Sequence, residues 1–136
     1  MEGINEECKE SGRKSMRGNS STKGWAIVTG ASSGMGLVFA RELAQRGHNV
    51  LAVARRRDRL ETLARNESAR GGRTAPFAAD LGTSEGLGSP VARMRDLGTI
   101  ELLVNNAGVA TSGNFSESVL ERELAEIRLN VNTVVT

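Results

Sequence analysis

The 136-residue sequence contains no tyrosine, one cysteine and one histidine, and only 3% of its residues are aromatic. Because Cys8 is the only cysteine, an internal disulfide is excluded. Because His48 is the only histidine, a histidine-based metal cluster is excluded too, and we expect no metal site. With so few aromatic side chains, valine, leucine, isoleucine and alanine must fill any hydrophobic core.

Long hydrophobic runs are also missing. None approaches the roughly 20 apolar residues that a membrane-spanning helix needs, and the first residues carry no apolar segment of the signal-peptide type. The net charge of +2, with a sequence pI of about 9.2, does not by itself favour nucleic acid or membrane binding. We therefore expect a cytoplasmic protein that binds neither nucleic acid nor a membrane.

The most informative stretch is the glycine-rich segment 29–36, Thr-Gly-Ala-Ser-Ser-Gly-Met-Gly. An apolar run, 25–28, enters it, and a helical pattern of apolar residues leaves it. Strand, glycine turn and helix in this order form the arrangement that binds the phosphates of a dinucleotide. Glycine permits the turn and the close approach of a phosphate, while the N–H groups and the dipole at the helix start favour negative charge.

The remaining sequence repeats the alternation of strand and helix without an internal repeat. We predict four strands and flanking helices, which favours an α/β fold of the Rossmann type, with a doubly wound parallel sheet that is incomplete. The polar residues 1–22 are interpreted as a disordered tail, or alternatively as a targeting or partner-binding arm. Residues 23–136 form the predicted domain. The first expected strand starts near residue 23 or 25 and ends at 29, and the other expected strands are 49–54, 73–79 and 100–104. The expected helices are 34–46, 58–69, 89–97 and one that begins near 117.

Three arginines follow the second predicted strand, whose carboxyl end lies beside the adenosine ribose in this type of fold. An acidic residue there would bind the ribose 2′-hydroxyl of NAD, but Ala54 takes that place and Arg55 follows it. An arginine can pair with a 2′-phosphate by charge and by its bidentate fork, which favours NADP over NAD. The alternative is that Arg55, Arg56 and Arg57 only begin a solvated helix face.

Other polar or small residues end the third and fourth strands. Asp80 could touch the adenine, or it could be a turn or helix-capping residue. The segment 105–108, Asn-Asn-Ala-Gly, could let a nicotinamide ribose approach, or it could simply form a turn. We expect a loop over 82–88. Five apolar residues near the end share one helix face and are assigned to core packing or to a subunit contact: Leu120, Leu124, Ile127, Val131 and Val134.

Taken together, the chain from about residue 23 onward resembles the N-terminal part of a short-chain dehydrogenase/reductase. Four matches carry the resemblance, namely the glycine turn 29–36, Ala-Arg-Arg at 54–56, Asp-Leu at 80–81 and Asn-Asn-Ala-Gly at 105–108. It implies an NADP-dependent oxidoreductase that moves a hydride between the cofactor and an alcohol or carbonyl substrate, usually as a homo-oligomer. The implied cofactor-binding residues are Gly30, Ser32, Ser33, Gly34, Met35, Gly36, Arg55, Asp80, Leu81, Asn106, Ala107 and Gly108.

The resemblance also implies a catalytic contribution from Asn130, which matches the family asparagine that supports a proton relay through water. The family's catalytic serine, tyrosine and lysine follow the matched region, and this chain contains no tyrosine. We therefore expect that the chain is a fragment of a longer oxidoreductase. The alternative is a catalytically inactive short form that only binds cofactor or a partner subunit.

Overall fold

The computed structural model describes residues 23–135, so the predicted disordered tail, 1–22, lies outside the described residues. Four parallel strands form one sheet in the order β3-β2-β1-β4: β1 (Trp25–Thr29), β2 (Asn49–Ala54), β3 (Arg73–Ala78) and β4 (Ile100–Val104). The strands are connected by α1 (Gly34–Gln45), α2 (Arg57–Ser68) and α3 (Ser84–Arg95). The predicted α/β fold with a four-stranded, doubly wound parallel sheet is confirmed.

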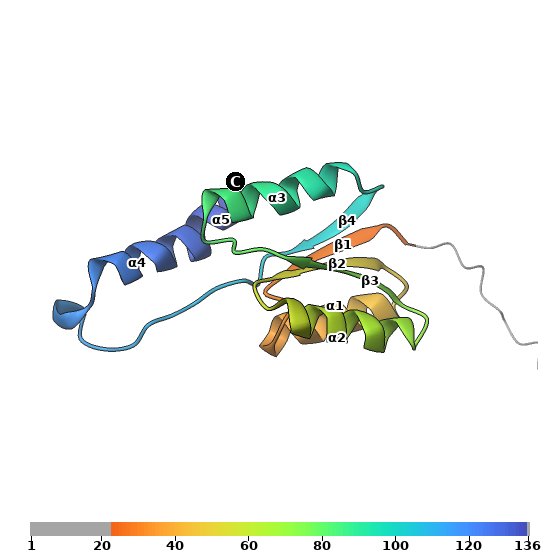
Figure 1. Cartoon of the computed structure of the whole chain (residues 1–136), viewed down its shortest axis with the longest axis horizontal. Helices are drawn as coiled ribbons and strands as arrows, with labels where there is room; N and C mark the ends of the chain where they lie inside the picture. Colours follow the sequence, from red (N-terminus) through yellow and green to blue (C-terminus); the bar gives the residue numbers. More distant parts are fainter. Residues whose placement is uncertain (1–22, 136) are drawn as a thin grey trace, which may run out of the picture.

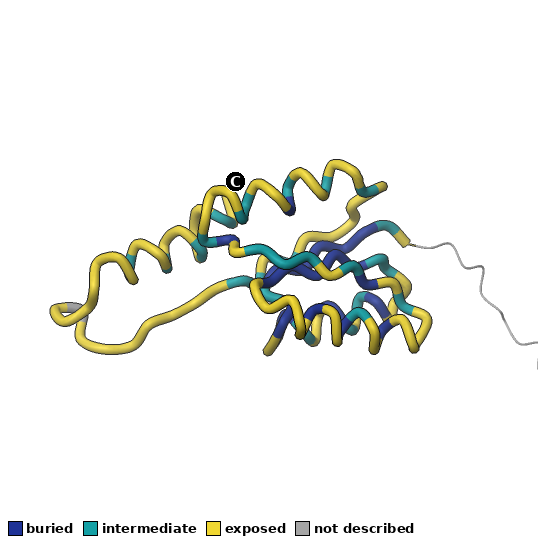
Figure 2. Tube along the Cα trace, in the orientation of Figure 1, coloured by how far each residue is buried: buried dark blue, intermediate teal, exposed yellow. Residues whose placement is uncertain are grey.

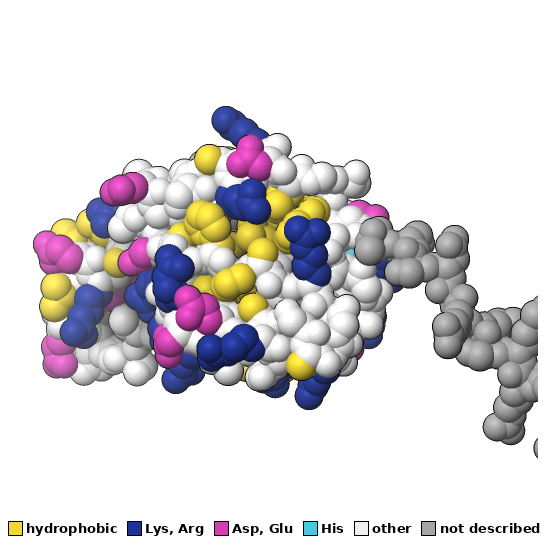
Figure 3. Space-filling model, turned by 45° about the vertical axis from the view of Figure 1, so that its right-hand side comes forward, with side chains coloured by type: hydrophobic (Ala, Val, Ile, Leu, Met, Phe, Trp, Pro, Cys, Tyr) yellow, Lys and Arg dark blue, Asp and Glu magenta, His cyan; other side chains and the backbone are white. Residues whose placement is uncertain are grey.

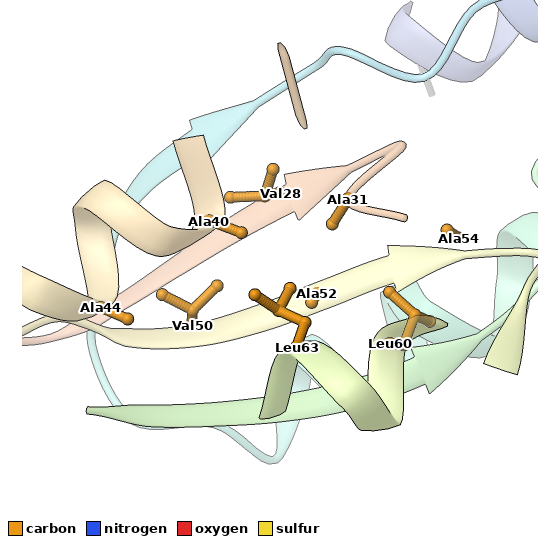
Figure 4. Packing of buried hydrophobic residues seen from close by; sticks show 9 residues of the cluster. All are labelled: Val28, Ala31, Ala40, Ala44, Val50, Ala52, Ala54, Leu60 and Leu63. Atoms are coloured by element: carbon orange, nitrogen blue, oxygen red, sulfur yellow. The ribbon is translucent and has the colours of Figure 1, made fainter. Parts of the chain in front are cut away.

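Helices cover both faces of this sheet, with α1 and α2 on one side and α3 on the other (Figure 1). The alternation of side chains along β1 and β2 separates two hydrophobic clusters. Val28, Val50 and Ala52 face α1 and α2, where they pack with Leu60 and Leu63 (Figure 4). The opposite side chains form the other cluster with residues of α3: Trp25, Ile27, Leu51 and Val53.

The central strands are the most deeply buried part of the domain (Figure 2). All five residues of β1 are buried, as are all but the first of β2, which explains why their sequences are almost continuously apolar. In contrast, β4 pairs only with β1, and Ile100, Leu102 and Leu103 stay 40–52% exposed. Figure 3 shows hydrophobic side chains gathered in the middle of one face of the molecule, with charged side chains around them.

The expected loop over 82–88 was wrong, because α3 already begins at Ser84. Thr83 is the N-cap residue, and its hydroxyl accepts a hydrogen bond of 3.0 Å from the Gly86 N–H. A side-chain cap stabilises a helix start by about 1 kcal/mol, which offsets the cost of about 1 kcal/mol for a glycine inside the helix. The capping threonine therefore favours a start of α3 at Ser84 and offsets the cost of one of the two glycines in this helix.

The expected last helix is divided into three parts. After a short 3₁₀ turn, η1 (Phe115–Glu117), the chain forms α4 (Leu120–Ile127), a π-helical segment η2 (Arg128–Asn132) and α5 (Thr133–Val135). Core packing was the wrong assignment for the predicted apolar face, because its five residues are 40–65% exposed. Figure 1 shows the reason, since α4 extends away from the sheet. Within residues 23–135, no helix has both the length and the apolar character to cross a bilayer.

Candidate cofactor site

A cavity of about 230 Å³ lies where the carboxyl ends of the strands meet. Parallel strands bring their carboxyl ends to one edge of a sheet, which is where α/β proteins bind ligands. Nine of the predicted cofactor-binding residues line it: Gly30, Ser32, Ser33, Arg55, Asp80, Leu81, Asn106, Ala107 and Gly108. Five further residues line the cavity without having been among the predicted cofactor-binding residues: Ala54, Arg56, Ala79, Val109 and Leu129.

The glycine turn forms one wall of this cavity. Gly30 has a φ of 68°, a left-handed conformation that favours glycine. Gly36 is buried in the first turn of α1, where an added Cβ would collide with the Gly30 carbonyl oxygen and with the Asn106 side-chain nitrogen. The absence of a side chain at Gly36 therefore lets α1 pack directly on the turn.

Three predicted residues of the turn, Gly34, Met35 and Gly36, do not line the cavity. The Met35 side chain is on the outer surface, with the residue 72% exposed. However, α1 begins at Gly34, and the hydroxyl of its N-cap residue, Ser33, makes no capping hydrogen bond. The first N–H groups of a helix have no partner within the helix, and they carry its positive dipole end. Backbone N–H groups in this first turn are thus the groups that fit an anion.

A network around the Thr29 hydroxyl joins the glycine turn to the end of β4. The hydroxyl accepts hydrogen bonds of 2.9 Å from the N–H groups of Asn106 and Ala107, and it donates to the Val104 carbonyl oxygen at 3.3 Å. The Asn106 side-chain amide donates back to the Thr29 carbonyl oxygen at 3.1 Å. Two segments about 77 positions apart in sequence are thereby fixed next to each other. This role of Thr29 was not predicted from the sequence.

Asp80 adopts the turn geometry that was the alternative interpretation of this residue. Its carboxylate accepts a 3.0 Å hydrogen bond from the Gly82 N–H, and its carbonyl oxygen accepts from the Thr83 hydroxyl at 3.0 Å. It is nevertheless the only carboxylate among the lining residues of this cavity. Asp80 therefore both shapes the turn before α3 and presents an acceptor to the cavity.

Asn130 lies in the π-helical segment η2, next to the lining residue Leu129. Its amide nitrogen donates to the Val109 carbonyl oxygen at 2.7 Å, and its amide oxygen accepts from the Val109 N–H at 3.0 Å. These two bonds hold the segment after β4 against η2. The structure thus places Asn130 beside the cavity, with both ends of its amide bonded to one residue.

The basic side chains are at the end of β2. Arg56 donates to the Ser33 hydroxyl at 2.7 Å and to the Ser32 hydroxyl at 3.2 and 3.3 Å. Arg55 also lines the cavity, and it makes no hydrogen bond or ion pair with any residue in the described range. Among residues 23–135, no group of three or more histidine, cysteine, aspartate or glutamate side chains could hold a metal ion.

Comparison with known proteins agrees with this geometry. The profile of the short chain dehydrogenase family matches residues 24–136. The chain belongs to this family. Its fold, its glycine turn and the four sequence matches that predicted the family are therefore explained by common descent.

Particular relatives have the same core. Oxidoreductase UcpA from Salmonella typhimurium is 36% identical over 110 residues, which cover 80% of this chain and 41% of the relative. The ketone-specific alcohol dehydrogenase of Comamonas testosteroni superposes with a TM-score of 0.80 at 32% identity, over 85% of this chain and 46% of the other. A short-chain dehydrogenase from Sphingobium yanoikuyae, solved with NADPH, gives a TM-score of 0.79 at 35% identity, over 83% and 45% of the two chains. The chain thus spans less than half the length of these proteins.

Proposed function

We propose that this chain is the NADP(H)-binding part of a short-chain oxidoreductase. The observation that carries this proposal is the composition of the β2 end of the cavity. Ala54 occupies the position where an acidic residue would bind the ribose of NAD, and the next two lining residues are Arg55 and Arg56. Arginine pairs with phosphate through charge and parallel N–H donors. A relative of similar fold was solved in complex with NADPH.

The other walls of the cavity fit the rest of the cofactor. The turn at Gly30 and the uncapped start of α1 would hold the pyrophosphate, and Asp80 with Leu81 would hold the adenine. Asn106, Ala107 and Gly108 would face the nicotinamide ribose. When bound, NADP(H) would supply hydride transfer to or from an alcohol or carbonyl compound. We also propose that the substrate is a small alcohol or carbonyl compound, that Asn130 supports a proton relay through water, and that the protein is cytoplasmic.

A second candidate function is cofactor binding, or pairing with a partner subunit, without chemistry. It is favoured by the absence of tyrosine from the 136 residues, because the family's mechanism uses a tyrosine as general acid and base. Self-association is part of both candidates, and it is supported by the exposed apolar residues Leu124 and Ile127 of α4. The two candidates differ in whether the whole protein to which this chain belongs oxidises NADPH in the presence of a carbonyl compound.

The test of the proposed cofactor is a titration of the chain with NADPH and NADH, followed by cofactor fluorescence. We expect NADPH to bind about tenfold to a hundredfold more tightly, the range for one or two hydrogen bonds to a charged group. We expect Arg55→Ala to remove most of that difference, while Arg59→Ala, an exposed arginine of α2 outside the cavity, leaves it unchanged. Equal affinities of the unmodified chain for both cofactors would refute the assignment to NADP.

A further inference from the structure

The π-helical segment η2 is joined to the strand ends by side-chain hydrogen bonds. It packs mainly against α4 and α5, its own neighbours in the chain, and α4 extends away from the sheet (Figure 1). One connection is the pair of hydrogen bonds between Asn130 and Val109, next to the residues proposed to face the nicotinamide ribose. A second connection is made by Thr133, which directly follows η2.

The Thr133 hydroxyl has two backbone acceptors. It lies 2.9 Å from the Leu81 carbonyl oxygen, 52 positions earlier in the sequence, and 3.0 Å from the Arg128 carbonyl oxygen in η2. A hydroxyl has a single proton to donate, so the two acceptors compete for it. The Arg128 carbonyl oxygen already accepts a hydrogen bond from the Thr133 backbone N–H. We therefore assign the hydroxyl proton to the Leu81 carbonyl oxygen.

The π-helical turn is what frees this hydroxyl for a distant partner. A threonine in an α-helix commonly donates back to a carbonyl oxygen three or four residues earlier, which keeps its hydrogen bond within the helix. In η2 the turn is wider, and the carbonyl oxygen within reach is that of Arg128, five residues before Thr133. Because a backbone N–H already occupies that oxygen, the hydroxyl can join η2 to Leu81 without leaving the helix carbonyl unbonded.

Leu81 belongs to the walls of two hollows. It lines the cofactor cavity, and together with Thr133 it lines a smaller hollow of about 180 Å³ beside the start of α3. Leu81 is buried, and it belongs to the same hydrophobic cluster as Leu129, the residue of η2 that lines the cofactor cavity. The cavity wall that follows β3 is therefore joined to η2 by apolar packing and by the Thr133 hydrogen bond.

We propose that Thr133 is a positioning residue that couples the adenine end of the cavity to Asn130. This inference rests on the proposed function, in which Asp80 and Leu81 hold the adenine and Asn130 supports a proton relay. A ligand held against Leu81 restricts its backbone, and the Thr133 hydroxyl passes this restriction to η2. Asn130, three residues before Thr133, then stays bonded to Val109 for a larger fraction of the time. Binding at one end of the cavity thus fixes a side chain that serves the other end.

The probe for this proposal is 5′-AMP, which carries the adenine but no nicotinamide, added to the whole ¹⁵N-labelled chain. The readout is hydrogen exchange of the Val109 backbone N–H, which donates to the Asn130 side-chain oxygen at 3.0 Å. We expect saturating 5′-AMP to slow this exchange by about threefold to tenfold, the range for one neutral hydrogen bond. In Thr133→Val, which keeps the shape but removes the hydroxyl, the slowing should fall below about twofold.

Matched variants separate this coupling from a merely structural bond. Thr133→Ser keeps the hydroxyl and should retain the slowing. Thr62→Val removes an exposed threonine hydroxyl that donates to the Asp58 carbonyl oxygen within α2, and it should leave the slowing unchanged. A bond that only stabilises η2 would speed Val109 exchange equally with and without 5′-AMP, so the ratio of the two rates would stay the same in Thr133→Val. A direct contact of 5′-AMP with Val109 would also survive in that variant.

The outcomes are distinct. If 5′-AMP binds the unmodified chain but does not slow Val109 exchange, the coupling is overturned while the proposed function stands. An unchanged ratio of rates in Thr133→Val would overturn it as well, and so would loss of the slowing in Thr133→Ser, which retains the hydroxyl. If the unmodified chain binds neither 5′-AMP nor NADPH, the proposed function fails and the inference fails with it.

Discussion

Replacing Thr29 by valine tests how the two halves of the cavity are held together. Valine has nearly the shape of threonine but removes the hydroxyl, which bonds to Val104, Asn106 and Ala107. Thr29 is only 6% exposed, so water has little access to the place that the hydroxyl occupies beside the end of β4.

The expected cost follows from these three bonds. A buried donor or acceptor left without its partner costs about 1–3 kcal/mol. Asn106 and Ala107 are only half-buried at the edge of the cavity, so water can partly replace the hydroxyl. We therefore expect Thr29→Val to lower the free energy of unfolding by about 2–3 kcal/mol in total, which is a large part of the typical 5–15 kcal/mol.

Urea denaturation, followed by fluorescence, measures this change. Trp25 is the only tryptophan and is 8% exposed in β1, so its emission reports on the same strand. Thr29→Ser keeps the hydroxyl and should retain most of the stability. Thr62→Val is the matched control, since the exposed Thr62 hydroxyl bonds only within α2 and near it, and this variant should cost less than about 0.5 kcal/mol. Equal effects of Thr29→Val and Thr62→Val would refute the reasoning.

Two further predictions concern burial and close packing. Both carboxylate oxygens of Glu67 are buried without a hydrogen bond, and the ion pair with the largely exposed Arg70 is 3.7 Å long. Glu67→Leu should therefore raise the free energy of unfolding by about 1–3 kcal/mol. A lower urea midpoint of this variant would contradict the prediction. Gly36→Ala should abolish NADPH binding or folding, because its Cβ would collide with Gly30 and Asn106. The control Gly98→Ala has nothing within 4 Å of its Cβ and should change neither the NADPH titration nor the unfolding transition. Equal behaviour of the two variants would show that α1 does not need to approach the glycine turn closely.

The fold was largely predictable because each strand is a short apolar segment that can be recognised from its local sequence. The apolar run 49–54 is β2 without a shift at either end, and 100–104 is β4, since each is bounded by polar or small residues. The start of α3 was missed because its glycines resemble a loop, whereas the decisive contact is one hydroxyl of Thr83. A π-helical segment likewise interrupts the apolar periodicity near Asn130, and the sequence pattern contains no local signal for it.

The sequence motifs of the candidate site were predicted, but the hydrogen bonds that join its residues were not. Gly30, Asp80 and Asn106 carry recognisable spacing, and all three line the cavity. The contacts of Thr29 and Arg56 were missed because their partners lie far away in the sequence, in the segment after β4 and in the glycine turn respectively. Such partners become visible only when the sheet order places the strand ends side by side.

The most direct test of NADP(H) binding at this cavity is an NMR titration of the ¹⁵N-labelled chain with NADPH, compared with the same titration with NADH. We expect amide shifts concentrated in four segments, 29–36, 54–56, 79–81 and 106–109, which contain the turn and every lining residue except Leu129. The shifts at 54–56 should be much weaker for NADH. Shifts confined to other segments, such as 111–123, or no shifts at saturating NADPH, would contradict it.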